Sequence, residues 1–484
     1  MSNNENPRKS KGRVYTPSYI VKNILDLSHY NGSNILNKHV IDNSCGDGAF
    51  LTEIVSRYCN EAIKNHIDAK TLKNHLEEFI HGIEIDAEEH RQCLNNLNNT
   101  IKNFGITEHV SWDVICGDTL SINKFNGKID YVLGNPPYVR VHNLENSFDL
   151  SKKFSFVQSG MIDLYIIFYE IGIKMLNSQG VLGYISPSSF FNSLAGYHLR
   201  KFLVQEQIIE SIVDLKHFQA FNATTYTTIV ILNKNYHGNA LNYYQFDDKN
   251  LIPYYVDKLK SNDYYIAENF YFSTKDNLKL LKNIFYNSGH CHIDVKNGYA
   301  TLCDPVFINN FNFESKYILP VIKASRGEKK RIIYPYNKHG QLITFEELSK
   351  DENIINYLLQ NKDKLTERSM EKKSQNHWYA FGRSQAINDT YKNKISINTL
   401  LRSEKDIKLV SAPPGTGVYS GLYLIGDDRD LSRVESLITN KEFITYISLL
   451  GKYKSGGYYT YSSKDIKSYL DYKLAYDGGL FNDD

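Results

Sequence analysis

Hydrophobic residues in the first half of the chain alternate between two spacings, one typical of strands and the other typical of helices. The apolar stretch "HVIDNS" (39–44) is short, so it predicts a strand. In the stretch that follows, "GAFLTEIVSRY" (48–58), apolar residues recur at intervals of three and four: Phe50, Leu51, Ile54, Val55 and Tyr58. This spacing predicts a helix with one buried face.

The same alternation continues to about residue 234. Further strands are predicted over 78–86, 110–118, 128–135, 180–187, 208–215 and 225–234, and further helices over about 87–104 and 161–176. Strands that alternate with helices indicate an α/β fold with a mostly parallel sheet, here of seven strands, and helices on both faces. Such sheets bind their ligands beyond the carboxyl ends of the strands.

The pattern changes beyond about residue 234. Residues 235–270 are polar and aromatic without a regular period, and a helix is predicted over 275–285. Short mixed segments and charged stretches follow. We therefore expect an N-terminal domain over 1–240, a connecting segment over 241–294 and a second domain of mixed α/β character over 295–484.

The composition is that of a globular protein of two or three domains. The chain has 484 residues, of which 42% are hydrophobic and 23% are charged. No apolar run approaches the roughly 20 residues of a membrane span, so no membrane partner is expected. The start, "MSNNENPRKSKGR", is polar and basic without an apolar core, which excludes a signal peptide there and predicts a cytoplasmic location.

Cysteines and charge narrow the possibilities further. The six cysteines (Cys45, Cys59, Cys93, Cys116, Cys291 and Cys303) include no CxxC pair, which suits a reducing compartment and argues against a zinc ribbon. The stretch "HCHID" (290–294) has no second cluster at ligand spacing, so no metal is expected. Because the net charge is only +2, any binding of nucleic acid would depend on local basic patches.

A glycine turn joins the first strand to the first helix in "VIDNSCGDGAF" (40–50). Gly46 and Gly48 allow a tight turn and a close approach of the backbone to a ligand. The turn matches neither GxGxxG nor GxxxxGK[ST], and the flanking Asp42 and Asp47 would repel a pyrophosphate. The turn therefore favours a cationic or amine-bearing ligand over a dinucleotide or nucleoside triphosphate.

Carboxylates also end the next two predicted strands. Glu84 could accept hydrogen bonds from two ribose hydroxyls, and Asp118 could accept one from an adenine amino group. Any one of these acids could instead be a helix N-cap. Together with the glycine turn they predict a pocket for an adenosine without phosphates, for which S-adenosylmethionine is the natural candidate.

The fourth predicted strand ends in a stiff elbow, "YVLGNPPYVRVH" (131–142). Two adjacent prolines offer no backbone donor and stop a strand abruptly, although such a pair often serves only as a turn. The side-chain oxygen of Asn135 and the carbonyl of Pro136 could accept both N–H groups of an exocyclic amine and so free its lone pair for methyl transfer. Tyr138 would stack on the ring that carries the amine.

The order of these motifs resembles that of the amino-group DNA adenine methyltransferases of the gamma class, as found in restriction–modification systems. The resembling stretches are "GRVYTP" (12–17), "DNSCGDGAF" (42–50), "GIEID" (82–86), "CGD" (116–118), "GNPPY" (134–138), "GVLGYISPSSF" (180–190) and "FNATTYTTIVIL" (221–232). The resemblance implies a Rossmann-like, S-adenosylmethionine-dependent methyltransferase fold. It also implies site-specific methylation of the adenine N6 amino group in double-stranded DNA, after the adenine has been flipped out.

The resemblance further implies the roles of individual residues. The catalytic set would be Asn135, Pro136, Tyr138 and Phe221, with Phe221 stacking on the adenine opposite Tyr138. The cofactor would be held by Thr16, Pro17, Asp42, Ser44, Gly46, Glu84, Ile85, Asp118, Thr119, Asn135 and Phe168.

Two features depart from the family pattern. Glu84 lies well past the usual interval of about 20 residues after the glycine turn, which implies an inserted helix over about 62–79. The sequence Asp42-Asn43-Ser44 replaces the more usual Glu/Asp-Pro at this turn.

The second half resembles target-recognition domains, including those of methylase modules in fused restriction–modification enzymes. The resembling stretches are 295–308, 317–331, 411–425 and 454–472. There, Lys323, Arg326, Lys329, Lys330 and Arg331 would contact DNA phosphates and base edges, although a solvated loop is the alternative for this charge run. No N-terminal stretch is long enough for an endonuclease domain, so cleavage is not expected and a separate cognate restriction endonuclease is a candidate partner. The expected setting is the nucleoid in a bacterial or archaeal cytoplasm.

Three other functions stay open at this point. Methylation of RNA adenine would use the same chemistry, and protein-glutamine methyltransferases share the "NPPY" motif. Those enzymes carry only a small extra module, whereas over 200 residues follow the catalytic part here. A catalytically silent DNA-binding subunit of a restriction assembly is the third alternative, and the intact "NPPY" argues against it.

Overall fold

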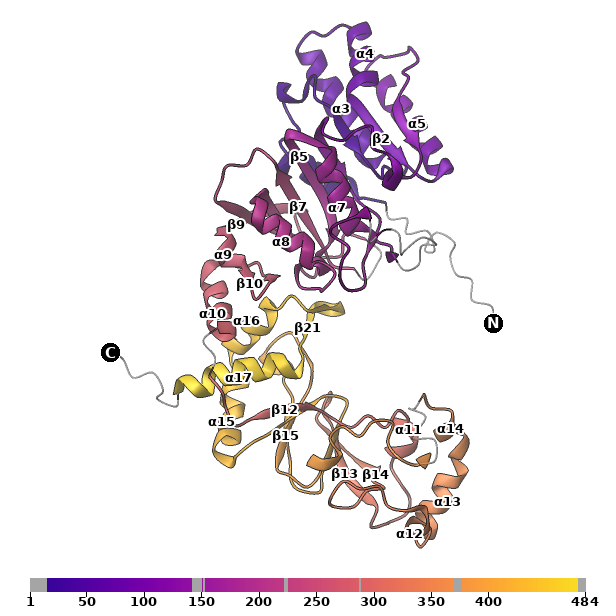
Figure 1. Cartoon of the computed structure of the whole chain (residues 1–484), viewed down its shortest axis with the longest axis vertical. Helices are drawn as coiled ribbons and strands as arrows, with labels where there is room; N and C mark the ends of the chain where they lie inside the picture. The colour runs from indigo at the N-terminus through magenta and orange to yellow at the C-terminus, as the bar shows by residue number, and fades with distance from the viewer. Residues whose placement is uncertain are drawn as a thin grey trace, which may run out of the picture. The chain divides into compact units, whose positions relative to one another are not determined.

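The computed structural model describes residues 15–141, 150, 153–221, 225–286, 289–369 and 377–477 (Figure 1). The first three residues of "GRVYTP" (12–17) lie outside these ranges. The chain divides into two compact units, Met1–Lys279 and Leu280–Asp484, which are described separately. Within the described residues, no helix combines the length and hydropathy that crossing a bilayer requires.

A nine-stranded sheet in the order β3-β2-β1-β4-β5-β7-β6-β8-β9 forms the centre of the first unit. Its strands are β1 (Val40–Asp42), β2 (Ile80–Glu84), β3 (Asp113–Cys116), β4 (Ile129–Gly134), β5 (Leu176–Pro187), β6 (Ile209–Asp214), β7 (Thr227–Asn233), β8 (Ala240–Asp247) and β9 (Ile252–Lys260). The strands from β3 to β5 are parallel, and β7 runs antiparallel to both β5 and β6. The expected α/β fold with a mostly parallel sheet is confirmed.

The sheet has two strands more than the sequence predicted. β8 lies parallel to β6, and β9 pairs with β8 in a hairpin. Residues 240–260 thus extend the sheet, although we expected no regular structure there and placed a connecting segment from residue 241. β9 is mostly exposed and β8 only partly buried, so neither carries the strong alternation of apolar and polar residues that marks a strand.

Helices flank this sheet. They are α2 (Ser18–Leu27), α3 (Ala49–Lys64), α4 (Ala69–Phe79), α5 (Ala87–Lys102), α7 (Leu164–Met175) and α8 (Tyr197–Glu206), with 3₁₀ turns η1 (Ser33–Ile35), η2 (Thr119–Ser121) and η4 (Ser188–Phe191). The sequence predicted α3, α4, α5 and α7, but not α2 or α8. The inserted helix is confirmed as α4. It begins later than expected because α3 continues to Lys64, and the Asp68 side chain caps α4 by accepting from the Thr71 N–H. The elements α9 (Ser261–Tyr264), β10 (Tyr265–Ile266) and β11 (Asn269–Phe270) follow, and α10 (Lys275–Tyr286) spans the boundary between the two units.

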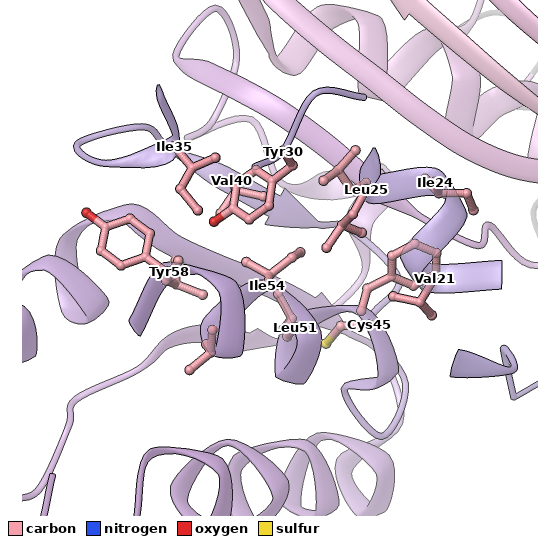
Figure 2. Packing of buried hydrophobic residues seen from close by; sticks show 14 of the residues in the cluster. Val21, Ile24, Leu25, Tyr30, Ile35, Val40, Cys45, Leu51, Ile54 and Tyr58 are labelled. Carbon is pink, nitrogen blue, oxygen red and sulfur yellow. The ribbon is translucent and has the colours of Figure 1, made fainter. Parts of the chain in front are cut away.

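The core beside the glycine turn joins α2 to α3. Figure 2 shows side chains from these two helices packed together with Val40 of β1: Val21, Ile24, Leu25, Leu51, Ile54 and Tyr58, which like Val40 are at most 1% exposed. α2 follows the residues Thr16-Pro17, and α3 follows the glycine turn. The packing of α2 on α3 therefore fixes the position of Thr16-Pro17 relative to the glycine turn.

Three small sheets are found among the described residues of the second unit. Their orders are β12-β19-β15-β17, β14-β13-β18 and β16-β21-β20. The strands are β12 (Asp294–Asn297), β13 (Ile318–Lys323), β14 (Glu328–Ile333), β15 (Lys394–Ile397), β16 (Leu400–Leu401), β17 (Leu409–Ala412), β18 (Gly417–Tyr419), β19 (Leu422–Ile425), β20 (Tyr453–Lys454) and β21 (Tyr458–Thr460).

Helices complete this second, mixed α/β unit. They are α11 (Asp304–Phe307), α12 (Phe345–Leu348), α13 (Glu352–Gln360), α14 (Lys362–Thr366), α15 (Asp428–Ile438), α16 (Lys441–Leu449) and α17 (Ser463–Asp477), with 3₁₀ turns η6 (Ile387–Asp389), η7 (Glu404–Asp406) and η8 (Ser455–Gly457). Aromatic rings fill much of its core, among them Tyr299, Tyr334, Tyr336 and Phe381. The chain contains 37 tyrosines, and several of those in this unit thus serve its packing.

Candidate functional site

A cavity of about 590 Å³ lies at the carboxyl ends of β1 to β4. Among its lining residues are all the predicted cofactor residues except Pro17: Thr16, Asp42, Ser44, Gly46, Glu84, Ile85, Asp118, Thr119, Asn135 and Phe168. Pro136 and Tyr138 line it as well, whereas Phe221 does not. The fold thus gathers residues from six separate segments into one pocket, as expected for a parallel sheet.

Hydrogen bonds to the Glu84 carboxylate hold the backbone of the glycine turn in place. The Gly46 N–H donates to Glu84 Oε2 (2.9 Å), and the Asp86 N–H donates to Oε1 (2.8 Å). Gly46 and Gly48 have φ of +53° and +91°, in the region that favours glycine. Each Glu84 oxygen keeps a second lone pair for a ligand, so Glu84 both braces the turn and lines the pocket.

The cavity is acidic. Its lining includes Asp42, Asp47, Glu84, Asp86, Glu89 and Asp118, and none of the described residues that line it is Lys, Arg or His. Asp42 is 2% exposed, and burial raises its pKa to about 8, with Glu84 and Asp47 adding to the rise. Burial, with the charge of Glu89, also raises the pKa of Asp47. Such a cavity favours a cationic ligand and disfavours phosphates.

Asp42 also explains the glycine that precedes the elbow. The Ser44 N–H donates to Asp42 Oδ1 (3.0 Å), which holds the carboxyl group against β4. A Cβ atom on Gly134 would lie 2.7 Å from the same oxygen. The absence of a side chain at residue 134 therefore lets the elbow approach the acid.

Asn135 lines the cavity, and its side chain carries an unpaired acceptor. Its Nδ2 donates to Thr16 Oγ1 (3.1 Å), and its backbone carbonyl accepts from Ser44 Oγ (3.2 Å). Its side-chain Oδ1 is buried and has no hydrogen-bond partner. An unsatisfied buried acceptor costs about 1–3 kcal/mol, so a ligand that donates to it is favoured.

The two aromatic residues predicted to stack on a base lie together, but not as facing plates. The ring centroids of Tyr138 and Phe221 are 6.1 Å apart at an interplanar angle of 75°. Phe221 is only 8% exposed, and residues 222–224 of its motif lie outside the described ranges. Two perpendicular rings leave no slot for a base, which needs parallel faces roughly 7 Å apart.

Two strand-end residues have structural partners as well. Asp118 accepts from the Leu120 N–H (3.0 Å) and so caps η2, which is the alternative role considered for these acids. The buried Thr119 donates its hydroxyl to the carbonyl of Asn43 (2.6 Å). These contacts fix the end of β3 beside the glycine turn.

Sequence reasoning missed Tyr15 and Glu89 as lining residues. The Tyr15 hydroxyl donates to Glu89 Oε1 (3.0 Å), which links the residues before α2 to the first turn of α5. Glu89 is 8% exposed although it is acidic, and no motif marks it in the sequence. Asp86 caps α5 by accepting from the Glu88 and Glu89 N–H groups. The three-residue spacing between Asp86 and Glu89 is therefore the only sequence signal that could have indicated Glu89.

The five predicted DNA-contacting residues lie on one hairpin of the second unit. Lys323 ends β13, Arg326 is in the turn, and Lys329, Lys330 and Arg331 are on β14. Arg331 is already engaged, since its guanidinium donates to the carbonyls of Phe311 and Phe313 and to Glu314. Arg326 and Lys330 pair only loosely with Glu328, at 3.8 and 4.0 Å, and their side chains are 66% and 38% exposed. These two residues, with Lys323 and Lys329, are therefore the better candidates.

The stretch "HCHID" (290–294) does not form a metal site among the described residues. There, Cys291 contacts Lys467, whose Nζ lies 3.6 Å from the sulfur and donates to Asp471. That the protein needs no metal stays a prediction from the sequence.

Residues 24–221 match the family described as Eco57I restriction-modification methylase. This match spans the glycine turn, Glu84 and the elbow. The match covers less than half of the 484-residue chain and identifies a restriction–modification methylase domain over these residues. Through this domain the chain is a DNA methyltransferase of the restriction–modification type.

Known relatives agree with this assignment. The Type II methyltransferase M.BstVI of Geobacillus stearothermophilus is 28% identical over 419 residues, which cover 76% of this chain and 73% of that protein. The Type II restriction enzyme and methyltransferase RM.Eco57I of Escherichia coli is 25% identical over 548 residues, which cover 90% of this chain. The match spans about half of RM.Eco57I, 54% of its length.

A solved structure shares the fold. The Type IIL restriction-modification enzyme MmeI, in complex with DNA, matches with a TM-score of 0.60 at 13% identity. The match covers 96% of this chain and 68% of that one. At this identity the likeness concerns the fold alone.

Proposed function

We propose that this methylase transfers a methyl group from S-adenosylmethionine to the N6 amino group of an adenine at a specific site in double-stranded DNA. The observation that carries the proposal is the unpaired side-chain oxygen of Asn135, a residue that lines the acidic cavity. An amino group is the donor that this acceptor lacks. The match of residues 24–221 to restriction–modification methylases favours DNA over RNA or a protein glutamine.

The cavity suits S-adenosylmethionine. Its volume of about 590 Å³ falls within the usual range for small-molecule pockets, about 300–1,000 Å³. Glu84 and Asp118 offer acceptors to the ribose and the adenine, and Ile85, which is 70% exposed, offers an apolar contact for the adenine. When bound, the cofactor supplies an electrophilic methyl group on a positively charged sulfur, and the acidic lining suits that charge.

The residues of the elbow prepare the adenine. Oδ1 of Asn135 and the carbonyl of Pro136 would accept the two N–H groups of the amine and draw its nitrogen toward a pyramidal geometry. The prolines fix the backbone of the elbow that carries both acceptors, which contributes to electrostatic preorganisation. Tyr138 would stack on the base, and Phe221 would have to turn from its edge contact to cover the other face. No strong base is needed, since the proton can leave after the transfer.

The protein must bind the DNA around the adenine before the base can enter the cavity. A base inside a duplex cannot reach a pocket of this kind, so it must be flipped out. Lys323, Arg326, Lys329 and Lys330 on the hairpin of the second unit would contact phosphates while this happens. The DNA complex of MmeI, which shares the fold, supports this role. Acting on chromosomal DNA would place the protein at the nucleoid in the cytoplasm, with a separate cognate restriction endonuclease as the expected partner.

The test is a transfer assay that identifies the product. The chain is incubated with labelled S-adenosylmethionine and either duplex DNA or RNA of the same sequence, and the nucleosides are then separated by mass spectrometry. We expect N6-methyladenine from duplex DNA alone. N4-methylcytosine, or label in RNA only, would contradict the proposal. DNA binding without any transfer would instead favour a silent subunit.

A further inference from the structure

We propose that Thr16 is a positioning residue for the methyl transfer: its hydroxyl holds the Asn135 amide in the orientation that presents Oδ1 to the adenine. This inference rests on the proposed function, because it assumes that Asn135 receives the amino group. It assigns to Thr16 a role in aligning the base, in place of the expected role as a cofactor ligand.

The two polar atoms of the Asn135 side-chain amide have different environments. Nδ2 donates to Thr16 Oγ1 at 3.1 Å across 119 positions of the sequence, while Oδ1 stays buried without a partner. The terminal torsion of an asparagine is broad, so the amide turns easily unless a partner holds it. A reversed amide would present N–H groups to the adenine amine, and two donors cannot bond.

The backbone of Thr16 is held firmly enough for this role. A residue that precedes proline is restricted to extended conformations. Pro17 is the N-cap of α2, and its carbonyl accepts from the Ile20 N–H (3.0 Å) and the Val21 N–H (3.2 Å). Ile20 and Val21 are at most 1% exposed, so the start of α2 is anchored in the core.

The residue before Thr16 is tied to a different part of the cavity. The Tyr15 hydroxyl donates to Glu89 Oε1 on α5, the helix that follows the Glu84 strand. Two adjacent residues therefore join the carboxylate side of the pocket to the elbow. A hydroxyl at residue 16 is consequently placed by contacts that do not depend on Asn135 itself.

Three variants test the inference by comparing the change in kcat with the change in the dissociation constant for S-adenosylmethionine. Thr16→Val keeps the shape of the side chain but removes the acceptor, and we expect it to lower kcat by about tenfold to a hundredfold. Its dissociation constant for S-adenosylmethionine, measured by calorimetry, should change less than about threefold. Thr16→Ser keeps the hydroxyl and should recover most of the lost rate, and Asn135→Ala combined with Thr16→Val should be no slower than Asn135→Ala alone.

Two outcomes of these assays would overturn the inference. A wild-type kcat in Thr16→Val would show that the hydrogen bond does not align the amide. A loss of cofactor affinity as large as the loss of turnover would make Thr16 a cofactor ligand instead.

A readout that needs no activity separates this inference from the proposed function. The side-chain amide of Asn135 gives a pair of NMR signals in asparagine-labelled protein, assigned by their loss in Asn135→Ala. We expect Thr16→Val to shift or broaden this pair, and Thr16→Ser to leave it close to its wild-type position. An unchanged pair in Thr16→Val would contradict the hydrogen bond. If the wild type methylated no DNA while the pair shifted as expected, the proposed function would fail and the contact would stand.

Discussion

At the scale of single residues, the site combines one unpaired acceptor with one buried acid. Oδ1 of Asn135 has no partner, and Asp42 carries a carboxyl group that burial keeps protonated at neutral pH. Both arrangements are unfavourable in a pocket that holds no ligand. Each becomes favourable when a donor group or a positive charge arrives, so the two residues are suited to binding rather than to stability.

Asn135→Ala should lower kcat by about a hundredfold to a thousandfold, because one preorganised acceptor is removed. The dissociation constant for S-adenosylmethionine should stay close to that of the wild type, since Asn135 is assigned chiefly to the base. The melting temperature should also change little, because the substitution removes an unsatisfied atom together with a single hydrogen bond. An equal loss of cofactor affinity would contradict the assignment.

Asp42 predicts how cofactor affinity depends on pH. Its pKa of about 8 means that the carboxyl group is mostly neutral at pH 6 and must lose its proton to attract a cation. Affinity for S-adenosylmethionine should therefore rise between pH 6 and pH 8, by at most about tenfold per pH unit, and level off above the pKa. Titrations with Asp42→Asn should lack this slope. A wild-type affinity that is flat over the same range would rule out the contribution of Asp42.

At the scale of elements, the glycine turn between β1 and α3 depends on its neighbours. Glu84 at the end of β2 accepts from the Gly46 N–H, and α5 lies so close that a Cβ on Gly48 would come within 2.8 Å of Cys93 Sγ. The inserted helix α4 lengthens the chain between the turn and Glu84 without moving Glu84 away from it, since β1 and β2 pair directly. Sequence distance from the turn is therefore a poor guide to the acid that is proposed to bind the ribose.

Gly48→Ala should destabilise the protein by more than Gly105→Ala does. Both glycines have positive φ, +91° and +76°, but only Gly48 lies against another side chain. We expect about 1 kcal/mol for Gly105→Ala from backbone strain, and about 1–3 kcal/mol more for Gly48→Ala from the contact with Cys93. Urea unfolding measures both free energies. Equal losses of unfolding free energy in the two variants would mean that α5 shifts to accommodate the added methyl group.

At the scale of the whole molecule, the two units divide the work that the proposal requires. The first unit holds the acidic cavity and the elbow, and the second holds the basic hairpin of β13 and β14. The net charge of the chain is only +2, because the acids of the cavity offset basic residues elsewhere. The net charge therefore does not reveal the separation of the acidic cavity from the basic hairpin. DNA affinity should consequently depend on a few exposed cations rather than on the overall charge.

Arg326→Ala with Lys329→Ala should weaken duplex binding and reduce its dependence on salt. The slope of log K against log salt concentration should fall by about 1 for each phosphate that the variant no longer neutralises. Binding is measured by fluorescence anisotropy at several salt concentrations. Lys64→Ala with Lys102→Ala removes the same charge from exposed positions of the first unit and serves as the control. Equal effects of the two pairs would show that only net charge matters.

The sequence by itself determined the parts of this protein that depend on local pattern. The alternation of strands and helices predicted the parallel sheet, and the carboxylates at the strand ends, together with Asn135, predicted the residues that meet in the cavity. These features are readable because the carboxyl ends of parallel strands share one edge of the sheet, which makes convergence a consequence of order along the chain.

Only the tertiary structure decided the features that arise from contacts between distant segments. It paired Asn135 with Thr16 and left Oδ1 without a partner, tied Tyr15 to Glu89, and engaged Arg331 with Glu314. It also placed β8 and β9 in the main sheet, although their partly exposed residues follow no clear period. Such pairings depend on which side chains come within hydrogen-bond distance after folding, and no spacing in the sequence encodes that distance.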